Sequence, residues 1–227
     1  MSLKDVERCL KLELDVMDTE MKDVQPLPLS PHLVTTLDRM ERAFGHSRIN
    51  EASARWIVNS VNFEAYEMTT STIKNAQPLS VQCERGYRFG PVTLNHRKVV
   101  LSGRPDYSVW YGESESLCLN VLVVEAKGQI KGTNTISQLL ACMGCIHQAR
   151  KHEGKRNCGV YGMAYTGYSW HFLKISHESK WSELPVMGRR AHLEQPLGLL
   201  VWMFKRAVRP IQKKRQQKLR TRWCQMK

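Results

Sequence analysis

Apolar residues recur at two different periods along the chain. Between 50 and 69, residues such as Ala54, Val58 and Val61 recur three or four positions apart, which is typical of one buried face of a helix. Between 117 and 126 the chain is apolar almost throughout and rich in β-branched residues, which is typical of a central strand. The sequence therefore predicts that helices and strands alternate.

The same signals locate the other elements. Further helices are predicted at 2–23, 31–44, 136–153 and 197–208, and strands at 79–90, 98–112 (one long strand or a kinked pair) and 158–176 (two strands about a turn at Thr166-Gly167). Caps are expected at Ser30, Asn50 and Thr135, and 177–196 is expected to be irregular. This order predicts an α/β fold with a mixed sheet flanked by helices.

The predicted organisation is a helical extension at 1–45, a core at 46–180, and a linker with a basic C-terminal helix and tail at 181–227.

Positive charge is concentrated at the C-terminal end of the chain. The net charge is +13, but 205–227 carries ten of the 34 basic residues and no acid, so 24 basic and 21 acidic residues remain in 1–204. Such a tail attracts polyanions without reading their sequence, and its central cations are the expected nucleic-acid contacts: Lys213, Lys214, Arg215, Lys218 and Arg220. The alternative is a solvated helix end that aids solubility. The stretch also resembles nuclear-localisation patches, which would direct the protein to the nucleus.

Other features set the expected compartment. The N-terminus lacks the apolar segment of a secretory signal, no apolar run approaches the roughly 20 residues that span a bilayer, and seven cysteines suggest no disulfide framework. We therefore expect a reduced, intracellular protein with no membrane partner.

Cys142 and Cys145 form a C-x-x-C pair near His147 and Cys158, for which apolar packing is favoured over zinc. The aromatic residues of 161–172 are expected in the core rather than stacked on bases.

Charged residues at the ends of apolar runs mark a candidate site. Asp106 follows Pro105 where one apolar run resumes, and Glu125 and Lys127 end the strand at 117–126. Glu125 and Lys127 share a strand face because side chains alternate. Two carboxylates aimed at one point repel unless a cation lies between them, and Mg²⁺ or Mn²⁺ takes such oxygen ligands, to which the carbonyl of Ala126 would add another. The alternative is that Asp106 caps a turn while Glu125 and Lys127 form an ordinary surface ion pair.

These residues carry a family resemblance. Pro105-Asp106, followed by Glu125-Ala126-Lys127 after a strand, resembles the PD-(D/E)xK nuclease superfamily, and the resemblance extends over roughly 50–175. It implies a restriction-endonuclease-like core of a helix, three strands, a helix and a further strand. It also implies an acid on the first core helix that completes the metal site, for which Glu51 is the best match and Glu64 or Glu67 are substitutes.

The helix after the Glu-x-Lys strand contributes a further candidate. The resemblance implies that Gln138 contacts a phosphate or a metal-bound water. The tyrosine that RecB-like members carry four residues later is absent, because position 142 is cysteine. The alternative for Gln138 is a polar residue on the solvent side of the helix.

The leading hypothesis is a Mg²⁺- or Mn²⁺-dependent nuclease that prefers DNA over RNA. Asp106, Glu125 and Glu51 would hold the metal, Lys127 would activate or orient water, and Arg104 would contact phosphate. One alternative is a nuclease-like fold that binds nucleic acid, or targets a host, without turnover. Another is an interaction scaffold in which the apolar residues 197–204 dock a partner or a second copy of the chain as a homodimer.

Overall fold

The structure is a computed structural model that describes residues 1–45, 50–72, 79–111, 120–126, 134–187 and 192–208; for 111, 120–126, 134 and 207–208 it describes the backbone alone. The helices are α1 (Leu3–Leu10), α2 (Pro31–Phe44), α3 (Glu51–Thr70), α4 (Asn134–His152) and α5 (Glu194–Val208). The strands are β1 (Glu13–Leu14), β2 (Leu79–Cys83), β3 (Tyr87–Leu94), β4 (Arg97–Gly103), β5 (Tyr107–Tyr111), β6 (Asn120–Ala126), β7 (Val160–Tyr165), β8 (Ser169–Ile175) and β9 (Lys180–Met187).

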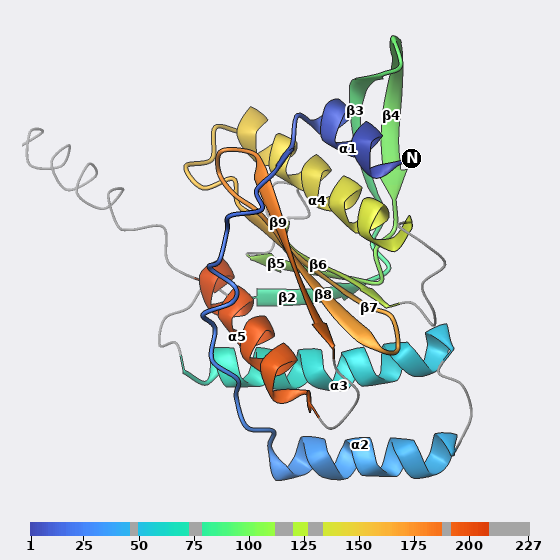
Figure 1. Cartoon of the computed structure of the whole chain (residues 1–227), viewed down its shortest axis with the longest axis vertical. Coiled ribbons are helices and arrows are strands. Elements are labelled where there is room, and N and C mark those ends of the chain that lie inside the picture. Colours follow the sequence, from blue (N-terminus) through green and yellow to red (C-terminus); the bar gives the residue numbers. More distant parts are fainter. Residues whose placement is uncertain (46–49, 73–78, 112–119, 127–133, 188–191, 209–227) are drawn as a thin grey trace, which may run out of the picture.

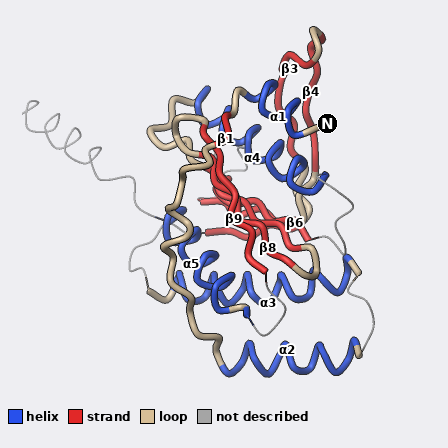
Figure 2. The backbone as a smooth tube through the Cα atoms, viewed as in Figure 1, coloured by secondary structure: helices blue, strands red, loops and turns tan. Residues whose placement is uncertain are grey.

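A mixed sheet forms the middle layer of the molecule. Its order is β1-β9-β8-β7-β6-β5-β2, while β3 and β4 pair separately as a hairpin. The pairs β2–β5, β5–β6, β7–β8 and β8–β9 are antiparallel, whereas β6–β7 and β1–β9 are parallel. Figure 1 shows α1 and α4 on one side of the sheet and α3, α5 and α2 on the other, and Figure 2 shows the hairpin projecting beside α1. The predicted α/β class and flanked mixed sheet are confirmed.

Each face of the sheet has its own hydrophobic core. On one face, α3 and α5 pack together, with the rings of Tyr66 and Phe204 edge to face at 6.3 Å, over sheet residues such as Val109 and Phe172. On the other, α1 and α4 pack over residues such as Leu173. Six apolar residues of α5 are buried within the chain: Leu197, Leu199, Leu200, Val201, Met203 and Phe204.

Several element predictions are confirmed. Ser30 caps α2 and Gly45 ends it, Asn50 caps α3, and β7 and β8 flank the predicted turn at Thr166-Gly167. The 98–112 segment is a kinked pair rather than one strand, and its halves belong to different sheets, since β4 pairs with β3 and β5 joins the main sheet. Thr135 is not a cap because α4 already begins at Asn134.

Two predictions at the ends of the chain were wrong. The helix predicted over 2–23 ends at Leu10, because Lys11 adopts a left-handed conformation (φ 53°) and the chain then runs into β1. The 177–196 segment, expected to be irregular, contains β9, which pairs with β8 from Trp181 to Met187. Of the two strands, β1 pairs with a strand distant in sequence, since its partner is β9, whereas β9 forms a hairpin with the preceding β8.

Ion pairs and close backbone packing hold the N-terminal segment to the body. Lys174 Nζ contacts Asp18 Oδ2 at 2.7 Å and Glu20 Oε2 at 2.6 Å, and Arg206 also pairs with Glu20. Farther along, Leu27 N donates to Glu194 O at 3.0 Å, so the chain passes directly over the start of α5. Within the described ranges, no helix combines the length and apolar character needed to cross a membrane.

The close passage over α5 predicts a strict requirement for glycine at position 198. A Cβ there would lie 2.3 Å from the backbone oxygen of Gln25, which cannot rotate away. Gly198→Ala should lower the free energy of unfolding by roughly 1–3 kcal/mol in urea titrations. Gly86→Ala is the matched control, because its Cβ would have only the Gly103 oxygen nearby, at 3.7 Å. Equal stability of the two variants would contradict this account of the packing.

Candidate functional site

Asp106 lies buried at the beginning of β5, at one end of the main sheet. Its side chain is only 6% exposed, and Pro105 before it is also buried. The Glu84 amide donates to the Asp106 carbonyl at 2.9 Å, which continues the β2–β5 pairing one residue beyond Cys83 and Tyr107. Burial of a carboxylate is costly unless charge or hydrogen bonds compensate it, so its partners define the site.

The strand register places acidic positions side by side at this end of the sheet. Tyr107 pairs with Val124 across β5 and β6, so one further step in the same antiparallel register sets position 125 opposite position 106. Glu84 lies opposite Asp106 on the other flank. Glu84, Asp106 and position 125 therefore follow one another across β2, β5 and β6, and we call them the acidic row.

One guanidinium gathers the carboxylates of this region. Arg55 Nη2 lies 2.5 Å from Asp106 Oδ1 and 3.0 Å from Glu51 Oε1, and Nη1 lies 3.2 Å from Glu84 Oε1. Burial would lower the pKa of Arg55, but the three carboxylates, Asp106 first, outweigh it and raise this pKa above its ordinary value. Arg55 is thus a fixed cation among three acids, one of them deeply buried.

Local sequence fixes this part of α3. The Asn50 side chain accepts from the Ser53 amide at 2.9 Å, and Ser53 Oγ accepts from the Asn50 amide at 2.9 Å, which sets the first turn. Glu51 then lies four residues before Arg55, the spacing at which helical side chains meet. The helix start therefore aims Arg55 at the end of β5.

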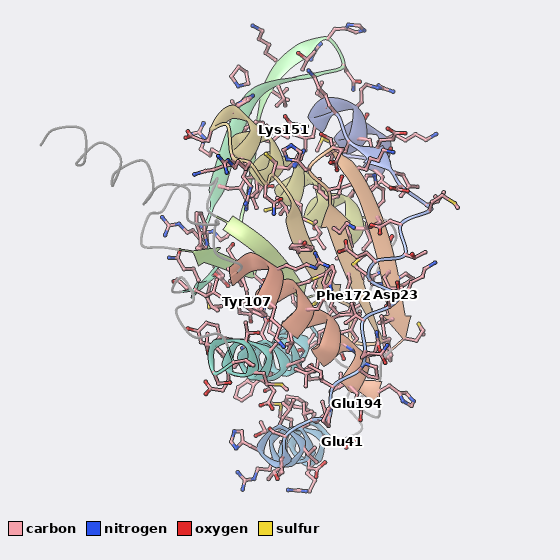
Figure 3. The ribbon with its side chains drawn as sticks, turned by 90° about the vertical axis from the view of Figure 1, so that its left-hand side faces the viewer. Asp23, Glu41, Tyr107, Lys151, Phe172 and Glu194 are labelled. Atoms are coloured by element: carbon pink, nitrogen blue, oxygen red, sulfur yellow. The ribbon has the colours of Figure 1, made fainter. Side chains whose placement is uncertain are left out.

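An open hollow adjoins the acidic row on the α3 side of the sheet. It has a volume of about 440 Å³ and is lined by Glu51, Ala52, Arg55, Trp56, Asn59 and Tyr107. Figure 3 shows Tyr107 on this side of the sheet. Burial raises the pKa of the Tyr107 hydroxyl, and the nearby Asp106 carboxylate raises it further. The indole of Trp56 is 60% exposed at the hollow.

The structure brings together some of the predicted site residues. Glu51 and Asp106 meet through Arg55, and the backbone of Glu125 and Ala126 lies in β6 next to β5. Arg104 is exposed two residues before Asp106, and Gln138 is exposed on the second turn of α4. Glu64 and Glu67 lie 13 and 16 residues beyond Glu51 along α3, more than three turns away from its first turn.

The remaining predicted residues fall where the structure describes no placement. Lys127 lies outside the described residues, and so does the basic tail: Lys213, Lys214, Arg215, Lys218 and Arg220.

The acids of this site fit a hard divalent cation by their chemistry. Glu51, Glu84 and Asp106 offer carboxylate oxygens of the type that Mg²⁺ and Mn²⁺ prefer. In the structure the guanidinium of Arg55 holds the position among them. Within the described ranges no cluster of three or more histidine, cysteine, aspartate or glutamate side chains has the geometry of a ready metal site. A metal ion at Asp106 would therefore have to share that carboxylate with Arg55 or displace it.

The C-x-x-C segment belongs to a core and not to an evident zinc site. Cys142 and Cys145 are buried in the core under α4, and burial raises the pKa of Cys145 to about 12. His147 is fully buried, with Nδ1 donating to the Cys158 carbonyl at 2.7 Å and Nε2 3.0 Å from Ser179 Oγ. Both ring nitrogens therefore have partners other than a metal.

The aromatic strand residues pack as expected. Tyr165, Trp170 and Phe172 are buried, and the rings of Tyr165 and Trp170 lie 4.4 Å apart. Tyr168, at the turn, is 40% exposed.

Sequence reasoning missed Arg55, Glu84 and Trp56. The spacing of Glu51 and Arg55 was visible as a helical ion pair. Their link to Asp106 was not, because 51 residues separate Arg55 from Asp106 and only the tertiary fold joins them.

No protein-family model and no curated protein matches the chain. The class that fold and site define is therefore a mixed α/β protein with a buried acid and a shared arginine at one end of its sheet.

The ion pair of Arg55 should contribute measurably to stability. Arg55→Met removes the counter-charge from the buried Asp106 carboxylate and should lower the free energy of unfolding by roughly 1–3 kcal/mol, a range that allows for the partial exposure of Arg55. Adding Asp106→Asn to this variant should recover part of the loss, because a buried amide costs less than a buried carboxylate. Urea denaturation of the two single variants and the double variant measures this coupling. Strictly additive losses would show that the pair does not act as a unit.

His147 should make stability fall in mild acid. Burial lowers its pKa, aided by the positive charges of Lys151, His177 and Arg150, and only partly opposed by its bond to the Cys158 carbonyl. The unfolded state takes up a proton below about pH 6.5 while the native ring stays neutral, so this contribution is present above that pH and is lost below it. His147→Gln should flatten the dependence of the unfolding free energy on pH between 7 and 5. His32→Gln, on the exposed side of α2, is the control; if it flattens the slope equally, the effect does not come from the buried ring.

Proposed function

We propose that this protein is a Mg²⁺- or Mn²⁺-dependent nuclease that cleaves phosphodiester bonds at the acidic row, with DNA preferred over RNA. The observation that carries the proposal is a buried aspartate, Asp106, at the start of a strand, with Glu84 on one flank and position 125 in register on the other. An aspartate is rarely buried at a sheet end without a structural or chemical reason, and Glu51 approaches the same point from α3.

The order of elements supports the same proposal. With the β3–β4 hairpin set aside, α3 is followed by β2, β5 and β6, then α4 and β7. This is the helix, three strands, helix and strand that the PD-(D/E)xK resemblance implies. The Pro105-Asp106 motif falls at the start of the second of these strands, and Glu125-Ala126 ends the third.

Each residue has a proposed role. Asp106, Glu125, Glu51 and the Ala126 carbonyl would hold the ion, which when bound would supply positive charge to the scissile phosphate and lower the pKa of a water. Lys127 would orient that water and offset phosphate charge. Gln138 would contact a phosphate or the water, Arg104 would bind phosphate beside the site, and the basic tail would raise affinity for the polyanion.

One observation favours a second candidate function. Because Arg55 already neutralises Asp106, the same fold could bind nucleic acid without turnover. Mn²⁺ titration by calorimetry separates the two functions. A nuclease should bind Mn²⁺, and the Asp106→Asn variant should lose that binding. A non-catalytic module should bind nucleic acid although neither protein binds Mn²⁺.

The nuclease proposal predicts that cleavage depends on Lys127 and Glu125. Wild type with Mn²⁺ should cut at least one of four labelled substrates (single- and double-stranded DNA and RNA), and Lys127→Ala and Glu125→Ala should each reduce the rate at least about 100-fold. Circular dichroism checks that the variants still fold. Lys180→Ala, an exposed change on β9, is the matched control and should cut normally. A wild type that cuts none of the substrates, or variants that cut at the wild-type rate, would refute the nuclease.

A further inference from the structure

The hollow beside the acidic row presents a large aromatic face to solvent. Trp56 follows Arg55 in α3, and 60% of its surface is exposed. The hollow places this indole with the guanidinium of Arg55, the side chain of Asn59 and the ring of Tyr107. An indole left this exposed loses the stabilisation that burial of its apolar surface would give, so it is a candidate for binding rather than packing.

The groups around Trp56 match a nucleobase. An indole face stacks on any base, and such stacking is tolerant of sequence. Asn59, which lines the hollow together with Tyr107, carries an amide that can pair with the edge of a base. The hollow of about 440 Å³ is within the range of small-ligand sites, about 300–1,000 Å³. The ten basic residues of 205–227, with no acid among them, would attract a polyanion to the chain, whereas 1–204 has 24 basic and 21 acidic residues and adds little to that attraction.

The position of the ring limits which nucleic acid can use it. The bases of an intact duplex already stack on their neighbours, and extruding one costs a few kcal/mol. A base in a single strand pays much less to leave its stack. The ring lies one residue from Arg55, which contacts Asp106 at 2.5 Å, so a base on Trp56 would hold its own backbone close to the acidic row.

We propose that Trp56 is a stacking platform for one unpaired base, and that it makes single-stranded nucleic acid the preferred substrate. This inference rests on the proposed function for the identity of the scissile phosphate, but the stacking contact is measured by binding alone. Trp56 is a specificity-determining residue in this account and takes no part in bond cleavage.

The chain supplies a matched control on the same helix. Phe63 is 58% exposed, nearly the same as Trp56, and lies seven residues later, so it projects from the same side of α3 two turns away. It does not line the hollow. A general apolar docking surface for a protein partner would use both rings, whereas a base held at the acidic row would use Trp56 alone.

The test is fluorescence anisotropy with the full chain, a labelled 12-mer of deoxythymidine and a blunt DNA duplex, in Ca²⁺ buffer to suppress cleavage. Trp56→Ala should weaken single-strand binding roughly 5- to 100-fold, the range for loss of one stacked base, and should change duplex binding by less than about twofold. Trp56→Phe should keep most of the affinity, and Phe63→Ala should bind like wild type.

Three outcomes would overturn the inference: an unchanged affinity in Trp56→Ala, an equal loss on single strand and duplex, or an equal loss in Phe63→Ala. Cleavage assays keep this result separate from the nuclease proposal. If Trp56→Ala binds normally while wild type cuts and Glu125→Ala does not, only the platform fails. If binding depends on Trp56 but no substrate is cut, only the nuclease fails.

Discussion

The shared guanidinium of Arg55 is the interaction on which this end of the molecule depends. It contacts carboxylates from three separate segments: Glu51 on its own helix, Glu84 after β2 and Asp106 before β5. Because Asp106 is buried, its charge needs a fixed partner of opposite sign, and α3 supplies one from a capped first turn. The arginine therefore joins the helix to the end of the sheet, and the position of the hollow follows from that junction.

The rest of the fold packs around the contact between α3 and the end of the sheet. A hydrophobic core lies on each face of the sheet, and α5 packs against α3 through contacts such as Tyr66 with Phe204. The N-terminal segment passes across α5 and is held by Lys174 and Arg206 through Asp18 and Glu20. The segment after β1 thus packs against α5, in the same layer as α3, which carries part of the candidate site.

Local signals in the sequence predicted the parts of the fold that local chemistry decides. Helix α3 has a good cap and a regular apolar period, so its bounds were predicted within a residue. β9 was not predicted because Pro185 lies within it, and proline is unfavourable inside a strand. Proline is tolerated there because residue 185 pairs with β8 on one side only. On its other side, the described part of β1 pairs with Lys180 and Trp181 and does not reach residue 185. The end of α1 depends on Lys11 adopting a left-handed backbone, for which a lysine gives no signal. In the same way, Asp106 was visible as a motif residue, whereas the tie to Arg55 depends on a tertiary contact.

The contact of Arg55 with Asp106 stabilises the free protein and would oppose metal binding at the same carboxylate. As a cation already in place, Arg55 gives the buried Asp106 carboxylate a partner of opposite charge at 2.5 Å. A divalent ion at the same oxygen would have to overcome that attraction, and the affinity of the site for metal would be lower than three acids alone suggest. The displaced guanidinium would then face the hollow, where its planar donors match a phosphate in geometry. In the proposed nuclease, Arg55 would stabilise the free protein and would become available to bind substrate phosphate when an ion occupied its carboxylate.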